Sequence, residues 1–444
     1  MKKISKYLLI FWISFITLGI MMGVTRHIYT NGQTIKGTPK SIIEFLSSYI
    51  SIIFHYGEEA NPMLTSIDKG KDLKDGFNYT SFYKGSKDYI LESAYGKKEK
   101  QSIVRLIRIR DGKTLHTWVP DIDFLNKKYN EILFFDSKNQ MNKKNTQIIN
   151  PILTNDGSII YGGTGFYKID KHSKIVWENV YRSHHSNEMD ENGDFWICGY
   201  NTNKTIARKF LLKDDAIQKI DGKTGNIIFQ KSIYEILKEN GYERGSIFVN
   251  PIITGNSKYY DYFHLNDIQP VTKESKHFKK GDLFISLRQL NLVVLYRPST
   301  SKILWKRTGD WLNQHDIEIL DDNRIAIFGN NITNGKFHIV SKNLIDGHNI
   351  EYIYDFEKDT LTTPFETLFK GANIGTFTEG RARILNNNEI FIEETNQGRL
   401  LYGNTKHLLW TYVNKTDENH FSQFNWCRYI TEDEFKKFTF VSKK

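Results

Sequence analysis

Short apolar runs bounded by Asp, Asn or Gly recur along the chain from about residue 78 to its end. Strands of four to eight residues separated by such turns are typical of an all-β fold. Within this pattern a longer unit recurs: a strand, an Asx/Gly turn, an apolar strand, and a strand that ends in a hairpin similar to Lys-x-Gly-Lys-Ile-x-Trp. About six copies are found, at 88–115, 153–177, 190–228, 281–305, 319–354 and 385–410.

Four short strands per unit, at a period of roughly 40 to 50 residues, are typical of a β-propeller. One unit alone cannot bury both faces of its sheet, whereas blades stacked around an axis cover one another. We therefore predict an all-β fold, a six-bladed β-propeller over residues 78–444. The terminal segment 421–441 is expected to complete the last blade.

The intervals between copies are longest at 121–146 and 232–263. We expect both to be loops above or below the blades. In the second, Ser232 to Asn240 predicts a helix that Gly241 ends.

A further helix is predicted before the repeats. Thr38 to His55 places its apolar residues on one helical face, and Ser41 with Glu44 fits a capping box. We expect this amphipathic helix, within a linker region of residues 31–77, to pack beneath the main domain.

The start of the chain predicts a membrane anchor. Lys2, Lys3 and Lys6 precede an uncharged apolar run from Tyr7 to Val24, about 27 Å long as a helix and close to the hydrocarbon thickness of a bilayer. Positive charge before the run favours a cytoplasmic N-terminus. A cleaved signal peptide is the alternative, but no small-x-small cleavage site follows the run. Residues 1–30 are therefore expected to be a single-pass signal anchor in the inner membrane, with the propeller in the periplasm or outside the cell.

Composition excludes some partners. The net charge is +10, but Lys and Arg occur in short scattered runs, without a basic helix or an aromatic-spaced stripe. We therefore predict no nucleic-acid partner. The two cysteines, Cys198 and Cys427, fit no zinc motif and could form a disulfide or remain buried thiols.

Histidines occupy one equivalent position in three repeats. His185 lies eight residues before Gly193 of one turn, His315 lies eight before Asn323 of another, and His264 opens the repeat between them. The first strand of a propeller blade lines the central channel. The starts of these strands are therefore expected to converge at one mouth of the channel.

Two polar residues join this group. Arg288 ends a strand in the same blade as His264, and Asn266 lies two residues after His264, on the same strand face. Each residue alone could be structural. Together, three imidazoles and a guanidinium can bind an oxyanion and move protons.

Two chemistries fit these residues. A zinc site could use His184 or His185 with His264 and His315, but no Asp, Glu or Cys shares the pattern and no HExxH spacing occurs. Alternatively, a neutral imidazole attacks an anionic sulfur or phosphorus centre, cations stabilise the oxygens, and a second histidine protonates the leaving group. No Walker loop, GxGxxG or GxSxG motif supports a nucleotide donor or serine-hydrolase chemistry.

The segments around these residues resemble the arylsulfate sulfotransferase (ASST) family. The likeness covers roughly 157–414 and is carried by His264-Leu-Asn-Asp-Ile, Phe284-Ile-Ser-Leu-Arg-Gln-Leu-Asn, Gln314-His-Asp-Ile-Glu-Ile-Leu and Ala382-Arg-Ile-Leu-Asn-Asn-Asn-Glu-Ile-Phe-Ile. The resemblance implies a six-bladed propeller that moves a sulfuryl group from a phenolic sulfate ester to a phenolic acceptor. It implies neither a nucleotide donor nor a cofactor, and a carbohydrate acceptor is the alternative.

The resemblance also implies residue roles. His315 matches the histidine that becomes transiently sulfated. His264, Asn266 and Arg288 match residues that hold the sulfate and assist proton transfer, and His185 matches another active-site histidine.

Three assignments stay open. His184 is the alternative to its neighbour as that further histidine. Well-studied members carry a separate N-terminal β-domain, for which no pattern is found in this sequence, so their homodimer is not carried over and a homodimer stays an open alternative. The other functions compatible with the residues are a non-catalytic propeller that binds a glycan or protein, and a metal-dependent hydrolase.

Overall fold

The chain divides into two compact units, residues 1–61 and 62–444. The computed structural model describes residues 12, 15, 16, 61, 63–66, 70, 72–132, 142–203, 205–248, 259–333, 343–386 and 388–440. Within this described part, no helix is both long enough and apolar enough to span a bilayer. The expected anchor at 7–24 lies outside the described residues except for Trp12, Phe15 and Ile16, and the expected helix at 38–55 lies outside them entirely. Both stay predictions.

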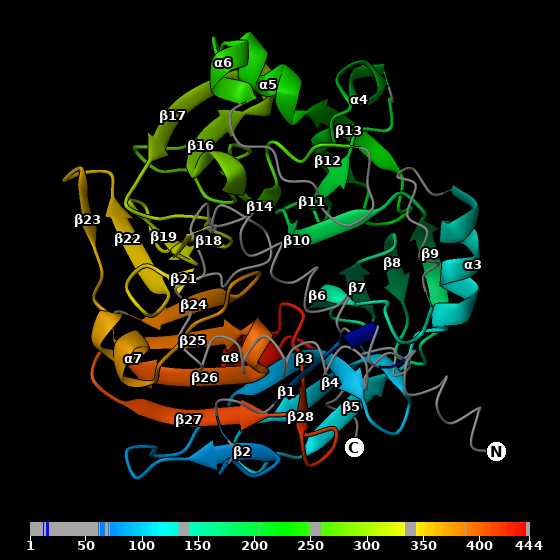
Figure 1. Ribbon diagram of the computed structural model, residues 1–444, viewed down its shortest axis with the longest axis vertical. Coiled ribbons are helices and arrows are strands. Elements are labelled where there is room, and N and C mark those ends of the chain that lie inside the picture. The colour runs from blue at the N-terminus through cyan, green and yellow to red at the C-terminus, as the bar shows by residue number, and fades with distance from the viewer. Residues whose placement is uncertain are drawn as a thin grey trace. The chain divides into compact units, whose positions relative to one another are not determined.

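The second unit is a six-bladed β-propeller, as predicted, and its inner strands face the centre of the ring (Figure 1). From the inner strand outwards, the first three blades are β29 (Arg428–Ile430), β3 (Tyr89–Gly96), β4 (Gln101–Arg108), β5 (Thr114–Trp118); β6 (Ile149–Leu153), β7 (Ile159–Gly162), β8 (Phe166–Ile169), β9 (Ile175–Asn179); and β10 (Ser183–Met189), β11 (Phe195–Tyr200), β12 (Asp215–Ile220), β13 (Ile227–Ser232). The other three are β14 (Leu265–Pro270), β15 (Leu283–Leu287), β16 (Leu292–Arg297), β17 (Lys302–Thr308); β18 (Ile317–Ile319), β19 (Arg324–Gly329), β22 (Ile350–Asp355), β23 (Thr360–Thr362); and β24 (Arg381–Asn386), β25 (Glu389–Glu394), β26 (Arg399–Asn404), β27 (Leu408–Val413).

The burial of each strand follows from its place in the blade. In the blade of β14 to β17, the middle strand β15 is buried throughout because neighbouring blades cover both its faces, whereas the outermost strand β17 alternates exposed and half-buried residues. Tryptophans on outer strands join successive blades. The indole of Trp118 donates to the carbonyl of Gly157 at 3.0 Å, and that of Trp177 donates to the carbonyl of Gly222 at 3.1 Å. In these two blades, the outer-strand Trp therefore binds a hairpin of the next blade.

Strands from both ends of the described unit close the ring. β29 is the innermost strand of the blade that begins with β3, where Arg428 faces Leu91, so the prediction that segment 421–441 completes the last blade is wrong. This pairing holds N-terminal and C-terminal strands in one sheet, so a single blade joins the two ends of the described unit. The last blade instead gains a fifth, outer strand, β2 (Gly76–Tyr79), which pairs with β27. Two short pairs complete the strands, β1 (Leu64–Ser66) with β28 (His420–Ser422) and β20 (Ile332–Thr333) with β21 (Asn343–Leu344).

Helices lie in the connections. The predicted helix is confirmed as α5 (Ile233–Glu239): Ser232 caps its first turn and Gly241, with φ of 83°, follows its end. The interval 121–146 was expected to be a loop but contains α3 (Ile122–Ile132), because Asp121 caps the first turn and Leu125 is buried against the blades. The other helical segments are α4 (Thr205–Phe210), α6 (Arg244–Ile247), α7 (Glu366–Gly371), α8 (Glu432–Phe435), η1 (Arg288–Leu290), η2 (Pro298–Thr300) and η3 (Thr395–Gln397).

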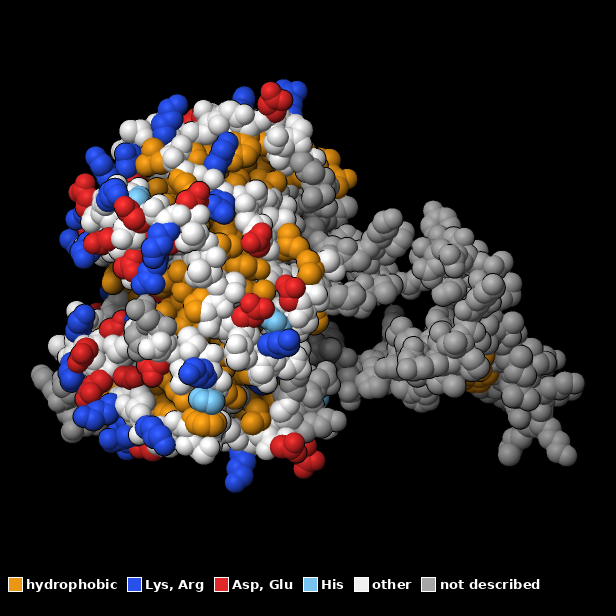
Figure 2. Space-filling model, turned by 90° about the vertical axis from the view of Figure 1, so that its left-hand side faces the viewer, with side chains coloured by type: hydrophobic (Ala, Val, Ile, Leu, Met, Phe, Trp, Pro, Cys, Tyr) orange, Lys and Arg blue, Asp and Glu red, His pale blue; other side chains and the backbone are white. Residues whose placement is uncertain are grey.

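Two features of composition find their place in the fold. Cys198 and Cys427 are both buried free thiols, which decides between the two alternatives left by the sequence. Basic and acidic side chains are interspersed over the side of the propeller seen in Figure 2. The positive charge is thus not gathered into one patch on that face.

Candidate functional site

Three consecutive blades bring their histidines together at the channel. His185 lies in a bulge of β10, His264 lies directly before β14, and His315 lies two residues before β18. The ring centroid of His185 is 5.0 Å from that of His264 and 5.7 Å from that of His315. The equivalent positions in the sequence repeats are thus neighbours in space.

The backbone that presents two of these imidazoles is left-handed. φ is 54° at His185 and 51° at His264, a region that residues other than glycine rarely adopt. Such a conformation costs about 1–3 kcal/mol and is found where the surrounding structure fixes it, often at functional sites. At both positions the inner strand begins with a bulge, which imposes this turn. The repeat pattern of the sequence does not predict the left-handed conformation.

Arg288 is a buried cation without an ionic partner in the described chain. Arg288 begins η1 directly after β15, and the residue is only 5% exposed. Other arginines of the propeller pair with carboxylates, for example Arg297 with Asp282 at 2.6 Å, but no carboxylate of the described residues lies within ion-pair distance of the Arg288 guanidinium. Burial lowers its pKa to about 10 while Asp261 opposes that shift, so it is a cation at neutral pH. An unneutralised guanidinium in a buried site favours an oxyanion ligand.

The contacts of His315 fix its tautomer. Its Nδ1 lies 2.5 Å from Oδ1 of Asn330 and 3.1 Å from the carbonyl of Asn313. The Asn330 amide nitrogen donates to the carbonyls of Thr376 and Glu379, so its oxygen faces the imidazole. Nδ1 therefore carries the proton. Nε2 accepts a hydrogen bond of 2.9 Å from the backbone N–H of Glu379, which places the lone pair of the neutral ring on Nε2.

Two of the three imidazoles are held neutral. Burial, followed by the positive charges of Arg288 and His264, lowers the pKa of His315 well below 6.5. Desolvation and the neighbouring His264, His184 and His315 lower the pKa of His185 in the same way. Both effects disfavour the charged form of an imidazole. His315 and His185 are therefore available as lone-pair donors at neutral pH.

The third imidazole has a different partner. Nδ1 of His264 lies 2.6 Å from Oδ2 of Asp261, and the His264 side chain is 22% exposed. By contrast, Nδ1 of His185 lies 2.9 Å from Nδ1 of His184. Nε2 of His184 is 3.5 Å from Asp215 but makes no hydrogen bond. Of the two alternatives, His185 is therefore the histidine that lies beside the other two imidazoles, and His184 contacts His185.

Asn266 is placed at the same junction. Its side-chain nitrogen donates to the carbonyl of Gln314 at 2.8 Å, next to His315, and its oxygen is buried without a hydrogen-bond partner. The donor thus ties the blade of β14 to the segment that carries His315, and the oxygen remains as an acceptor.

Sequence reasoning missed Asp261, Asn330 and Glu379. Asp261 stands three residues before a singled-out histidine, and this Asp-x-x-His spacing is a signal that could have been followed. Asn330 directly follows β19, but its contact with His315 depends on the fold. Glu379 acts through its backbone N–H, for which no side-chain pattern exists.

The segment that covers His315 has a testable geometry. Gly380 has φ of +86°, and a Cβ there would lie 2.5 Å from Cγ2 of Thr376 and 2.9 Å from Cε1 of Phe328. Gly281 has the same φ of +86° but nothing within 4 Å of such a Cβ. Gly281→Ala is expected to lower the free energy of unfolding by about 1 kcal/mol, and Gly380→Ala by about 1–3 kcal/mol more through overpacking. Equilibrium denaturation of both variants checks this, and equal losses would contradict the close packing over His315.

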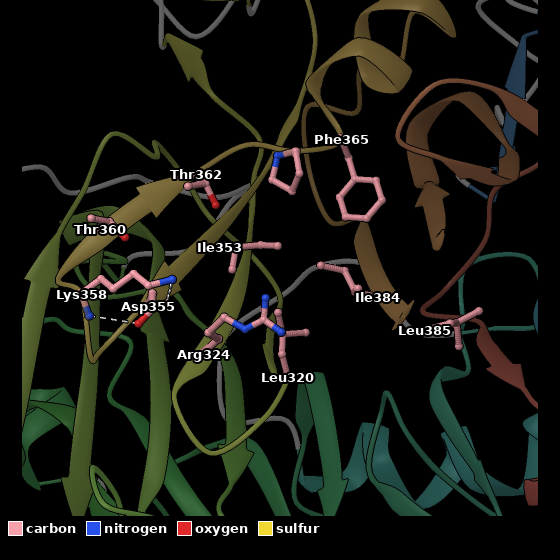
Figure 3. A pocket seen from close by; sticks show the side chains of 11 residues that line it. Leu320, Arg324, Ile353, Asp355, Lys358, Thr360, Thr362, Phe365, Ile384 and Leu385 are labelled. Carbon is pink, nitrogen blue, oxygen red and sulfur yellow. Dashed lines mark hydrogen bonds and ion pairs between the residues drawn. The ribbon is translucent and has the colours of Figure 1, made fainter. Parts of the chain in front are cut away.

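The described residues contain no group of three or more His, Cys, Asp or Glu arranged to hold a metal ion. They do form grooves elsewhere. Figure 3 shows one of about 330 Å³ between the blade of β19, β22 and β23 and the end of β24, with Leu320, Arg324 and Ile384 among the residues that line it. None of the predicted site residues lines this groove, which is therefore separate from the histidine site.

Comparison with known proteins gives one match that bears on this site. Residues 148–415, more than half of the chain, match the model of a family described as Arylsulfotransferase (ASST). No curated protein matches the sequence.

Several solved structures are similar at low identity. TolB from Acinetobacter baumannii is 8% identical with a TM-score of 0.42, over 80% of this chain and 68% of that one. The computationally designed Ika8 protein is 9% identical with a TM-score of 0.37, over 79% and 98%. A catalytically inactive virginiamycin B lyase from Staphylococcus aureus with quinupristin is 10% identical with a TM-score of 0.33, over 61% and 71%. These likenesses are too distant to bear on the chemistry of the site.

Proposed function

Because the chain belongs to the arylsulfotransferase (ASST) family, we propose that its histidine site moves a sulfuryl group from an aryl sulfate to a phenolic or carbohydrate acceptor. The proposal needs no nucleotide donor, because the donor ester itself carries the group. His315 is the nucleophile and is sulfated between the two half-reactions. Arg288 holds the sulfuryl oxygens, and His264 and His185 lie beside them.

The state of His315 supports its role in the first half-reaction. Its neutral ring carries a lone pair on Nε2 and a proton on Nδ1. The Nε2–S bond forms as the bond between sulfur and the aryl oxygen breaks, and that oxygen leaves as a phenol with a proton from His264 or His185. The lone pair that attacks is the one that Glu379 caps, so the donor must displace that N–H. Once displaced, the N–H is free to donate to a sulfuryl oxygen.

The second half-reaction reverses these bonds. The acceptor hydroxyl gives its proton to the imidazole that protonated the phenol, and its oxygen forms the new bond to sulfur as the Nε2–S bond breaks. Neutral His315 is restored and the sulfate ester of the acceptor leaves. Arg288 keeps the three oxygens in place through both steps, since it is rigidly set by the turn between β15 and β16.

The observation that carries this proposal is the buried Arg288 guanidinium beside three imidazoles from three blades. The experiment is incubation of the purified full chain with 4-nitrophenyl sulfate without acceptor. We expect release of one equivalent of 4-nitrophenol and a mass increase of one sulfuryl group. Peptide mapping should place an acid-labile modification on His315, because N-sulfated imidazoles are labile in acid.

Adding a phenolic acceptor should discharge the modified chain and return its original mass. A chain that releases no 4-nitrophenol and gains no mass with any aryl sulfate contradicts the proposal. That result would favour the alternative function, a non-catalytic propeller that binds a partner.

A further inference from the structure

We propose that Asp261 is a positioning residue that makes His264, and not His185, the group that gives the proton to the leaving phenol and takes it from the acceptor. This inference rests on the function proposed above. It adds a residue that holds the proton carrier and assigns one of the two imidazoles to that role.

Asp261 is fixed between two blades. It is 3% exposed, and its neighbour Tyr260 is held by two backbone hydrogen bonds, to the carbonyl of Leu211 at 2.7 Å and from the N–H of Lys213 at 2.8 Å. Leu211 and Lys213 lie between β11 and β12 of one blade, whereas His264 opens the next blade at β14. The carboxyl therefore approaches the imidazole on a rigid support.

Asp261 is a carboxylate at neutral pH. Burial raises its pKa, but the hydrogen bond and charge of His264 and the charge of Lys213 outweigh it, so the net shift is downward. Nζ of Lys213 lies 3.9 Å from the same oxygen that binds His264. An ionised carboxylate only accepts hydrogen bonds, so Nδ1 of His264 must donate. Nε2 is then the atom that loads and releases the catalytic proton.

The other imidazoles lack such support among the described residues. Nδ1 of His315 binds the amide oxygen of Asn330, and Nδ1 of His185 meets a second imidazole, that of His184. Amides and neutral imidazoles stabilise an imidazolium far less than a carboxylate does. The site thus contains one imidazole suited to carry positive charge and two suited to stay neutral.

The proton balance fits this division. In the first half-reaction the Nε2–H of the His264 imidazolium passes to the aryl oxygen as its bond to sulfur breaks, which leaves neutral His264. In the second, the acceptor O–H returns a proton to Nε2 as its oxygen bonds to sulfur. Asp261 keeps Nδ1–H throughout and is not itself protonated.

The test is a leaving-group series with Asp261→Asn in the full chain. For each aryl sulfate, the rate of His315 sulfation is measured in a single turnover. A nitrophenolate leaves without a proton, whereas unsubstituted phenol needs one, and general acid catalysis contributes about 10²–10⁴-fold. We expect phenyl sulfate to react about 10²-fold more slowly than with the parent chain. 4-Nitrophenyl sulfate should change by less than about threefold, which also shows that the variant folds.

The double variant supplies the control. Asp261→Asn in a His264→Ala background should cause no further loss, because the aspartate acts only through that imidazole. An equal loss for all leaving groups overturns the inference, as does a steeper leaving-group dependence in His185→Ala with none in Asp261→Asn. In both cases His315 is still sulfated, so the proposed function stands. The proposed function would fail on a different result, the absence of His315 sulfation with any donor.

Discussion

Replacing Arg288 by Met is expected to lower kcat/KM for aryl sulfates by about 10²–10³-fold, the effect of removing one preorganised charge-stabilising group. Arg288 is buried and has no ion-pair partner among the described residues, so an incoming sulfuryl group meets a cation that no carboxylate has neutralised. Charge on the sulfuryl oxygens is stabilised most where water is excluded. Stopped-flow measurement of 4-nitrophenol release checks the expected loss.

Two variants separate this effect from simple loss of an arginine. Arg297→Met removes a guanidinium from the same blade that is already bound by Asp282, and should leave kcat/KM within about twofold of the parent chain. Arg288→Lys keeps the charge but loses the planar fork, so we expect an intermediate rate. Unchanged turnover in Arg288→Met, with the fold intact by circular dichroism, would exclude the oxyanion role.

The repeat pattern was sufficient to predict the six blades because it is a local property. Each copy combines an Asx/Gly turn with apolar strands, and in two blades an outer tryptophan also binds the next blade, as Trp118 does at Gly157. The closure of the ring was not predictable in the same way. β29 and β3 lie more than 300 residues apart, and nothing local distinguishes an inner strand of the first blade from an outer strand of the last.

The candidate site could be predicted to the extent that it repeats. His185, His264 and His315 share one position in successive copies, and the fold turns that equivalence into ring distances of 5.0 and 5.7 Å. What differs between the copies escaped prediction. The protonation of His264 and the tautomer of His315 each depend on one neighbour, Asp261 and Asn330, and neither neighbour is part of the pattern that the copies share.

The local backbone geometry of the site could also not be predicted from the sequence. The left-handed backbone at His185 and Glu379, with φ of 54° and 55°, follows from how inner strands begin and not from residue type. At Glu379 this backbone conformation directs the residue's own N–H towards Nε2 of His315. Such a contact involves only main-chain atoms, and any residue could supply it.

His315→Ala is expected to lower turnover on the order of 10⁴-fold or more, the scale seen when a covalent nucleophile is removed. No other described imidazole has the same contacts, because the lone pair of His315 is set on Nε2 by Asn330 and Glu379. The variant should also gain no mass from 4-nitrophenyl sulfate. His277→Ala, which removes a histidine bound to Glu357 outside the site, should behave like the parent chain.

The pH dependence of His315 sulfation tests the same claim without a mutation. Burial, Arg288 and His264 hold the pKa of His315 well below 6.5, so its neutral form persists as the pH falls. An ordinary imidazole would lose about nine tenths of its neutral form between about pH 8 and pH 5.5. Asp261, whose pKa is lowered, and Arg288, whose pKa is about 10, keep their charges over this range. The single-turnover rate with 4-nitrophenyl sulfate should therefore change by less than about twofold, whereas a tenfold fall with a midpoint near 6.5 would show that the nucleophile titrates as an exposed histidine does.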